Sequence, residues 1–259
     1  MRESNQQAYV LINRPYSETS WISEVFTREH GRLGLMAKGA RRQKSKLKGA
    51  LMPFQPVRLD WVGKGEIPTL VSAEINLSEY SLLDHELTGD ALVCGFYCNE
   101  LIVNLLHRHD PHSVLFDRYH DTLIALAKSE QPLLLPAILR EFEISVMRET
   151  GYAVDFHNEA DGVSEVERDG FYRYQTGQGF IRVASQVRGS FSGRVIRSLD
   201  TSIIKAPTRT NDEHSSHQDG VILSAYELSQ AKQLMRDILR NSLGRRAIIS
   251  RELFYPKPR

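Results

Sequence analysis

Cationic side chains are concentrated in one short stretch near the start of the chain. Between residues 28 and 48, the single acid Glu29 stands among eight lysines and arginines. They are Arg28, Arg32, Lys38, Arg41, Arg42, Lys44, Lys46 and Lys48. Each Lys or Arg that contacts a phosphate releases condensed counterions without reading a base, so this run favours binding to a nucleic-acid backbone. The alternative is an ordinary solvated surface loop.

Aromatic residues are interleaved with these cations. They are Tyr9, Tyr16, Trp21, Phe26, Phe54 and Trp61. Unpaired bases stack on exposed aromatic rings, with roughly 1–3 kcal/mol for each base. Most of these rings must pack inside so small a region, whereas Tyr16 follows Pro15 in a predicted loop. We therefore expect Tyr16 to be a stacking platform for DNA.

Signatures of catalysis and of metal binding are missing from the sequence. The spacing of Gly31, Gly34 and Gly39 fits neither nucleotide-binding fingerprint, and no Gly-x-Ser-x-Gly or His-Glu-x-x-His motif occurs. The histidines at 107, 109, 112 and 120 lack the spacing of metal ligands. Cys94 and Cys98 have no second cysteine pair and lie in an apolar segment, which favours buried free thiols. We expect neither enzymatic activity nor a cofactor.

The charge of the chain is divided unevenly along its length. The 259 residues have a formal net charge of +1, are 41% hydrophobic and are 25% charged, as in globular proteins. Residues 1–80 and 232–259 are basic, whereas residues 81–231 are acidic. This asymmetry indicates a surface that binds polyanions. No stretch has the length of a membrane span and residues 1–7 have no apolar core, so we expect a cytoplasmic protein without a membrane partner.

The basic run must be positioned by β-strands. Short apolar runs broken by Pro15, Gly31, Gly39, Gly63 and Gly65 predict five strands. They lie within residues 8–14, 20–27, 31–40, 56–62 and 68–77. Five strands in so few residues predict a small barrel or sandwich, and the OB-fold is the five-stranded barrel most used on oligonucleotides. The first predicted domain is therefore an OB-fold nucleic-acid-binding domain at residues 1–82.

Helical periodicity begins at about residue 81. Apolar residues then recur every three or four positions and predict helices at about 89–109, 112–129, 136–150 and 224–243. Between the last two, residues 168–183 resemble a hairpin with its turn at 175–179, and residues 201–220 resemble a mobile polar loop. The second predicted domain is helical, at 83–259, with an irregular β-hairpin insertion at about 155–220. The predicted fold class is α+β.

The residues of the opening segment resemble a bacterial family, the recombination mediator RecO. The similarity is specific in the stretches RPYSE (14–18), AKGAR (37–41) and Pro53-Phe54, and continues through YCNELI (97–102) and REFEISVMRETGY (140–152). It extends to SRELF (250–254), so nearly the whole chain is covered. The resemblance implies an OB-fold followed by a helical domain.

The resemblance also implies a function in DNA repair and recombination. Proteins of this family bind single- and double-stranded DNA and anneal strands coated by the single-strand-binding protein SSB. They act with RecR to help load RecA, and they bind the acidic, apolar-ended tail of SSB. Arg140 and Arg148 lie on the matching helix, so they are the implied ligands of the tail carboxylates.

Two further interpretations follow from the sequence. Many members of the family carry a four-cysteine zinc module after the segment that here reads GYAVDF, but residues 157–180 contain no cysteine, so we expect no zinc module. The rival function is a non-catalytic adaptor, whose basic loop grips the SSB tail or another acidic protein instead of DNA.

Overall fold

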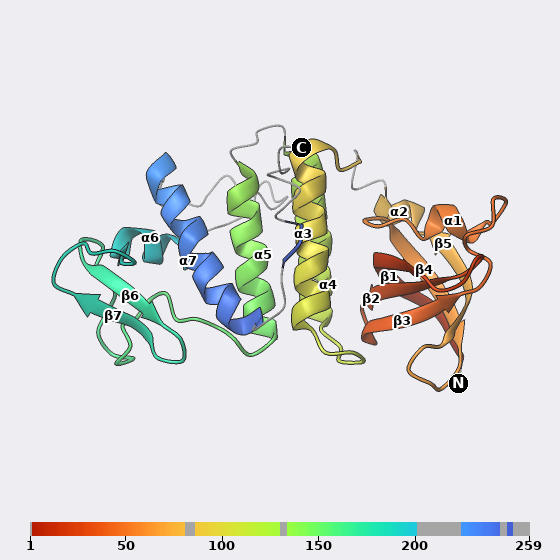
Figure 1. Cartoon of the computed structure of the whole chain (residues 1–259), viewed down its shortest axis with the longest axis horizontal. Coiled ribbons are helices and arrows are strands. Elements are labelled where there is room, and N and C mark those ends of the chain that lie inside the picture. Colours follow the sequence, from red (N-terminus) through yellow and green to blue (C-terminus); the bar gives the residue numbers. More distant parts are fainter. Residues whose placement is uncertain (1, 81–85, 130–133, 201–223, 244–247, 251–259) are drawn as a thin grey trace, which may run out of the picture. The chain divides into compact units, whose positions relative to one another are not determined.

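The chain folds into two compact units. The computed structural model describes residues 2–80, 86–129, 134–200, 224–243 and 248–250. Unit 1 comprises the described residues up to 135 together with 248–250, and unit 2 comprises those of 136–243. Figure 1 labels their elements. The two units are described separately below.

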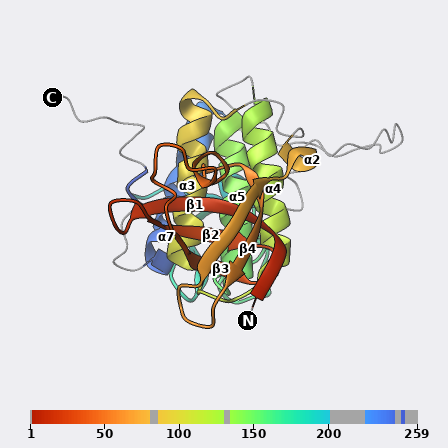
Figure 2. The same cartoon turned by 90° about the vertical axis from the view of Figure 1, so that its right-hand side faces the viewer.

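Unit 1 begins with a closed five-stranded barrel. Its strands are β1 (Arg2–Pro15), β2 (Trp21–Thr27), β3 (Gly31–Ala37), β4 (Pro56–Val62) and β5 (Thr69–Ile75). The order around the barrel is β1-β2-β3-β5-β4, with β1 antiparallel to both β2 and β4, and β3 parallel to β5. Figure 2 brings these strands to the front. This arrangement confirms the five predicted strands and the predicted OB-fold.

Strand β1 is longer than predicted. It starts at Arg2 instead of Ala8, because Arg2 and Glu3 pair with Val62 and Trp61 of β4. The first residues are polar, so no apolar alternation marks them as strand, and only the partner strand reveals their conformation. Two short helices lie next to the barrel strands in the sequence. Helix α1 (Leu47–Ala50) lies between β3 and β4, and α2 (Leu77–Tyr80) follows β5.

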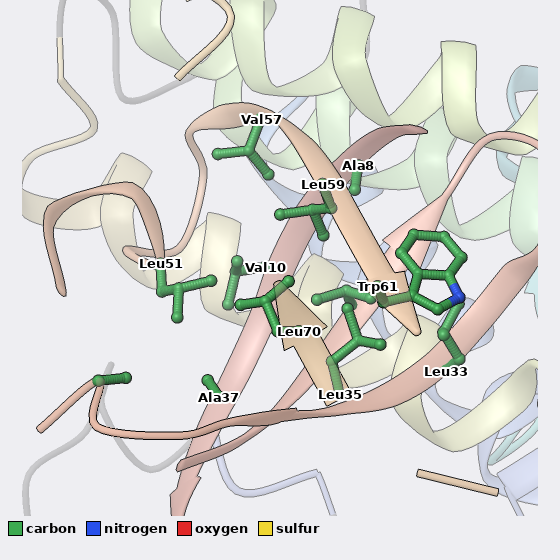
Figure 3. Close-up of a cluster of buried hydrophobic side chains, with 12 residues drawn as sticks. Ala8, Val10, Leu33, Leu35, Ala37, Leu51, Val57, Leu59, Trp61 and Leu70 are labelled. Carbon is green, nitrogen blue, oxygen red and sulfur yellow. The ribbon is translucent and has the colours of Figure 1, made fainter. Parts of the chain in front are cut away.

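The barrel interior is filled by aliphatic side chains from all five strands. Val10, Val25, Leu35, Leu59 and Leu70 are each at most 5% exposed, and Figure 3 shows the labelled members of this cluster converging from different strands. Alternation along each strand sends every second side chain inward, which is the physical origin of the apolar pattern in the sequence. The packed interior makes the barrel a rigid support for its loops.

Helices α3 (Gly89–Leu105) and α4 (Ser113–Lys128) belong to unit 1 and pack against the barrel. The buried ring of Tyr9 on β1 lies 5.6 Å from the ring of Phe116 and 5.1 Å from that of Tyr119. Asn99 of α3 donates from Nδ2 to the Leu11 carbonyl at 2.9 Å and accepts from the Tyr119 hydroxyl. These contacts join the strand to the two helices and satisfy the buried carboxamide of Asn99.

Helix α3 ends four residues before the predicted end at His109. Residues 106–110 leave the helix because they pair with the barrel: the His109 amide donates to the Arg32 carbonyl at 2.9 Å, and His109 has a φ of +59°. Periodicity alone could not reveal this end, since the competing partner is a strand distant in sequence. Cys94 and Cys98, on the same helix, are buried thiols that form no disulfide, as predicted.

Gly31 at the start of β3 is the residue of this junction that tolerates least change. Its φ is +65°, and a Cβ there would lie 1.9 Å from the Asp110 carbonyl oxygen. We expect Gly31→Ala to lower the free energy of unfolding by roughly 1–3 kcal/mol from φ alone, with the clash adding to this loss. Gly34→Ala on the same strand is the control, because its nearest neighbour is a side-chain atom at 3.5 Å. Urea unfolding followed by tryptophan fluorescence measures both, and equal losses would contradict the prediction.

Unit 2 combines two long helices with a small sheet. Its elements are α5 (Leu135–Glu149), β6 (Phe171–Gln175), β7 (Gly179–Val183), β8 (Phe191–Ser192), α6 (Gly193–Ser198) and α7 (Ala225–Leu243). The sheet order is β7-β6-β8, and β6 and β7 form the predicted hairpin. Helix α6 was not predicted, because six residues are too short to establish a helical period. The α+β class is confirmed.

Helix α7 starts with a capping box. The Ser224 hydroxyl accepts from the Glu227 amide at 3.2 Å, and the Glu227 carboxylate accepts from the Ser224 amide at 2.8 Å. These hydrogen bonds lower the pKa of Glu227. The polar loop predicted at 201–220 lies outside the described residues, as do residues 251–259.

Candidate nucleic-acid interface

Six of the eight cations that are predicted to bind DNA lie on one surface loop of the barrel. This basic loop, residues 38–48, leaves β3 and ends within α1. Its cations, Lys38, Arg41, Arg42, Lys44, Lys46 and Lys48, are all exposed. In the part of the chain that the structure describes, none of the six forms an ion pair with a carboxylate. Their charge is therefore available to an external polyanion.

Apolar residues within the basic loop fix it to the barrel. Ala40, inside the loop, and Leu51, just after it, are 0% exposed and belong to the barrel core, with Leu47 packed against them. Successive turns link these anchors: the Arg42 amide donates to the Gly39 carbonyl at 3.1 Å, and the Ser45 amide donates to the Arg42 carbonyl at 3.1 Å. The loop therefore holds its like charges together through buried side chains, which offset their mutual repulsion.

Arg41 connects the basic loop to the turn between β1 and β2. Its amide donates to the Thr19 carbonyl at 2.9 Å, and its guanidinium donates to the Ser17 carbonyl. The same turn carries Tyr16, whose side chain is 64% exposed and whose amide donates to Ser20 at 3.1 Å. The structure thus brings the predicted stacking residue to the same end of the barrel as the basic loop.

Arg28 and Arg32 lie apart from this loop and hold the barrel to the helices of unit 1. Arg28 forms a two-pronged ion pair with Asp117 of α4, with distances of 3.0 and 2.8 Å. Arg32 pairs with Glu24, which is 3% exposed and also binds Arg108 at 2.7 Å. Both guanidinium groups already have carboxylate partners, so the interface that we consider below consists of the basic loop and Tyr16.

Arg140 and Arg148 are on α5 but differ in environment. Arg140 is 12% exposed and pairs with Glu143, which is 1% exposed. Arg148 is exposed and lines a cavity of about 110 Å³, together with Ile144, Val154 and Phe156. Two aspartates, Asp155 and Asp200, line the same cavity.

Comparison with known proteins identifies the family. The family model described as Recombination protein O N terminal matches residues 1–78, and the model Recombination protein O C terminal matches residues 86–252. The chain belongs to the RecO family. The first matched range contains the barrel, and the second covers the segment that follows it.

Individual RecO relatives cover between two thirds and nearly all of this chain. DNA repair protein RecO from Thiobacillus denitrificans is 37% identical over 259 residues, which span 97% of this chain and 91% of the relative. The protein of the same name from Aromatoleum aromaticum is 37% identical over 97% of this chain and 95% of its own length. That from Azoarcus is 44% identical over 67% of this chain and 68% of its own length.

The segment that follows α5 contains no cysteine between residues 157 and 180. Within the described residues, no three His, Cys, Asp or Glu side chains are grouped to hold a metal ion. The segment after α5 is instead shaped by carboxylates that accept amide hydrogen bonds: Asp155 from His157 and Asn158, and Asp161 from Val163 and Ser164. A hydrogen bond from the Ser164 hydroxyl, together with the amide hydrogen bonds from Val163 and Ser164, lowers the pKa of Asp161. No helix in the described ranges is both long and apolar enough to cross a membrane.

Sequence reasoning did not reveal which groups accept hydrogen bonds from Arg41 and Arg28. The carbonyls of Ser17 and Thr19 hold Arg41, and the carboxylate of Asp117 holds Arg28. The run Pro15-Tyr16-Ser17 carried a turn signal, but nothing in it indicated Arg41 as its partner. Three further arginines near the end of the chain, Arg245, Arg246 and Arg251, could extend the basic track, but they fall outside the described residues.

Proposed function

We propose that this chain is a recombination mediator in DNA repair, which binds single- and double-stranded DNA through the basic loop and Tyr16. One observation carries the proposal: six exposed cations without carboxylate partners in the described ranges project from one loop that buried residues fix to a barrel. Phosphates repel each other when two strands meet. Cations at this surface lower that repulsion and leave the base edges free to pair, so strands anneal without a nucleotide cofactor or bond cleavage.

The partners in this proposal are SSB, RecR and, indirectly, RecA. The chain anneals strands coated by SSB and, with RecR, helps load RecA on DNA in the cytoplasm, at the nucleoid. For the acidic, apolar-ended tail of SSB, the exposed guanidinium of Arg148 beside the apolar side chains of Ile144 and Phe156 is the better ligand. Arg140 is a weaker candidate because its side chain is only 12% exposed and is less accessible to a peptide.

Strand annealing in the presence of purified SSB tests the proposed activity. Two complementary oligonucleotides, one labelled with a donor dye and one with an acceptor, are coated with SSB and mixed with the full chain. We expect annealing to accelerate at least tenfold without ATP, and to slow as salt rises because the phosphate contacts are electrostatic. An annealing rate equal to that with SSB alone would contradict the proposal.

The adaptor alternative makes a different prediction for the same chain. If the basic loop binds the SSB tail, removing its charges weakens binding of a tail peptide and leaves DNA affinity unchanged. In our proposal, the loop variant loses DNA binding and keeps peptide binding, whereas Arg148→Ala loses peptide binding and keeps DNA binding. Fluorescence anisotropy with a labelled peptide and a labelled oligonucleotide measures all four affinities. The opposite pattern would favour the adaptor.

A further inference from the structure

Unit 2 contains a cavity that the basic loop does not explain. Its volume is about 340 Å³, and it lies between the loop joining β7 to β8 and the first turns of α7. Cavities that take small ligands have roughly 300–1,000 Å³. Tyr226, Arg188 and Gln186 in its lining are exposed, so the cavity opens to solvent. A group about the size of a nucleobase can enter it.

Both walls of the cavity are fixed by local structure. On the loop side, the Val187 amide donates to the Ser190 hydroxyl at 3.0 Å, the Ser190 amide donates back to the Val187 carbonyl at 3.0 Å, and Phe191 is buried. On the helix side, Tyr226 and Gln230 are four residues apart and therefore share a face of α7. The cavity is thus preformed, which reduces the entropy lost on binding.

The polar groups of the cavity match the edge of a base. Gln186, Gln230 and Gln233 contribute three carboxamides, each with a donor and an acceptor, and the cavity lining contains no carboxylate. The Tyr226 hydroxyl accepts from Gln186 at 3.3 Å and from Gln230 at 3.2 Å. These bonds orient a ring that remains 61% exposed and can stack on a base.

The segment that supplies the loop side of this cavity is rich in arginine. Residues 168–199 hold six arginines and one acid, Asp169, although the central segment as a whole is acidic. Arg182, Arg194 and Arg197 form ion pairs with glutamates. In the part of unit 2 that the structure describes, Arg173 and Arg188 pair with no carboxylate.

Like Arg168, these two arginines have no carboxylate partner among the described residues, and Arg173 and Arg188 lie together at the cavity. Arg188 lines it, and the Arg173 guanidinium donates to the Arg188 carbonyl at 3.3 Å. A cavity lined mainly by carboxamides, with two exposed guanidinium groups at its edge, is suited to a nucleotide within a polymer, with its base in the cavity and its phosphates on the arginines. An acidic peptide would instead need cations inside the cavity, where Arg188 is the one cationic side chain in the lining.

We propose that this cavity binds an unpaired nucleobase of single-stranded DNA. Tyr226 stacks on the base, the carboxamides of Gln186, Gln230 and Gln233 bind its edge, and Arg173 and Arg188 contact the adjoining phosphates. A paired base cannot enter, because its edge and both faces are already occupied in the duplex. The inference takes from the proposed function that the polymer is DNA, but it concerns a different unit and a contact with bases instead of phosphates.

A comparison of normal and base-free oligonucleotides tests the inference. The full chain is titrated with labelled single strands of equal length, one with bases and one with an abasic backbone. We expect Tyr226→Ala to weaken binding of the normal strand about tenfold, as for the loss of one base–aromatic stack, and to leave binding of the abasic strand unchanged. Tyr226→Phe retains the ring and should keep most of the affinity.

The controls separate this site from the basic loop. Tyr152→Ala removes another exposed tyrosine of unit 2 and should change neither affinity. Removing the cations of the basic loop should weaken binding of the normal strand and of the abasic strand by the same factor. In one set of outcomes, the unaltered chain binds the normal strand, and Tyr226→Ala either leaves its affinity unchanged or lowers the affinity for both strands equally. Either result overturns the base site and leaves the proposed function standing. If the unaltered chain binds neither strand, both proposals fail.

Photocrosslinking locates the contact independently. A single strand that carries 5-iodouracil is irradiated with the full chain, and the linked peptide is identified by mass spectrometry. We expect the crosslink at Tyr226. The yield of crosslinked peptide should fall only slightly in Tyr226→Phe, because an aromatic ring remains. Crosslinks confined to unit 1 would overturn the inference.

Discussion

Replacing Arg41, Arg42, Lys44 and Lys46 together by alanine is expected to weaken binding to single-stranded DNA on the order of 100-fold at near-physiological salt. Each phosphate contact on a single strand contributes roughly 0.7 to the slope of log affinity against log salt. Four lost contacts should therefore make the slope shallower by about 2.8. Anisotropy titrations over a series of salt concentrations measure the affinity and the slope together.

A matched variant controls for net charge. Lys64, Arg118, Lys128 and Arg236 are also exposed, so their joint replacement by alanine removes the same charge from surfaces outside the basic loop. We expect this variant to retain most of the DNA affinity and nearly all of the salt slope. Equal losses in the two variants would mean that DNA responds to overall charge, and the assignment of the interface to the basic loop would then be wrong. A salt-independent affinity of the unaltered chain would have the same consequence.

The second large effect is expected at Glu24, in unit 1. Its carboxylate is 3% exposed and binds both Arg32, which is 13% exposed, and Arg108. Glu24→Ala leaves the largely buried Arg32 without a counter-charge, and removal of one partner from a buried pair costs about 3–5 kcal/mol. We expect a loss near the lower end of this range, because Arg108 is 36% exposed and can be solvated by water.

Tryptophan fluorescence makes this measurement specific to the barrel. The chain has two tryptophans, Trp21 on β2 and Trp61 on β4, so urea unfolding followed by their emission reports on unit 1. Asp117→Ala, which breaks the exposed pair with Arg28, is the control and should cause a much smaller loss. If the two variants lose equal stability, Glu24 does not act as a buried counter-charge.

Local pattern was sufficient to predict the elements but not their long-range partners. Alternation predicted the five strands, and the periodicity before Gly151 predicted α5. By contrast, Glu24 lies on the same face of β2 as Ile22 and Phe26, and nothing in the sequence indicates that Arg108 from a distant segment pairs with its buried carboxylate. Likewise, the character of the sequence changes at about residue 81, and the predicted domain division at 82 stays a prediction. The contacts group α3 and α4 with the barrel.

The candidate site was predictable in part for the same reason. The basic residues from Lys38 to Lys48 form one exposed loop because they are neighbours in sequence. Arg28 and Arg32 belong to the same run of charge, but Arg28 lies just before β3 and Arg32 lies within it, where they pair with Asp117 and Glu24. In unit 2, Tyr226 and Gln186 are separated by a long segment, so the cavity that they line has no signal in the sequence.

The aromatic contact between β1, β2 and α4 constrains how the chain can mature on the ribosome. Tyr9 and Phe26 emerge early, whereas Phe116 and Tyr119, which cover them, are synthesised much later. Until then, a nascent barrel presents two bare rings to the solvent, a surface prone to self-association. Fragments that stop before α4 should therefore aggregate or recruit chaperones, and limited proteolysis should release the barrel only with α3 and α4 attached.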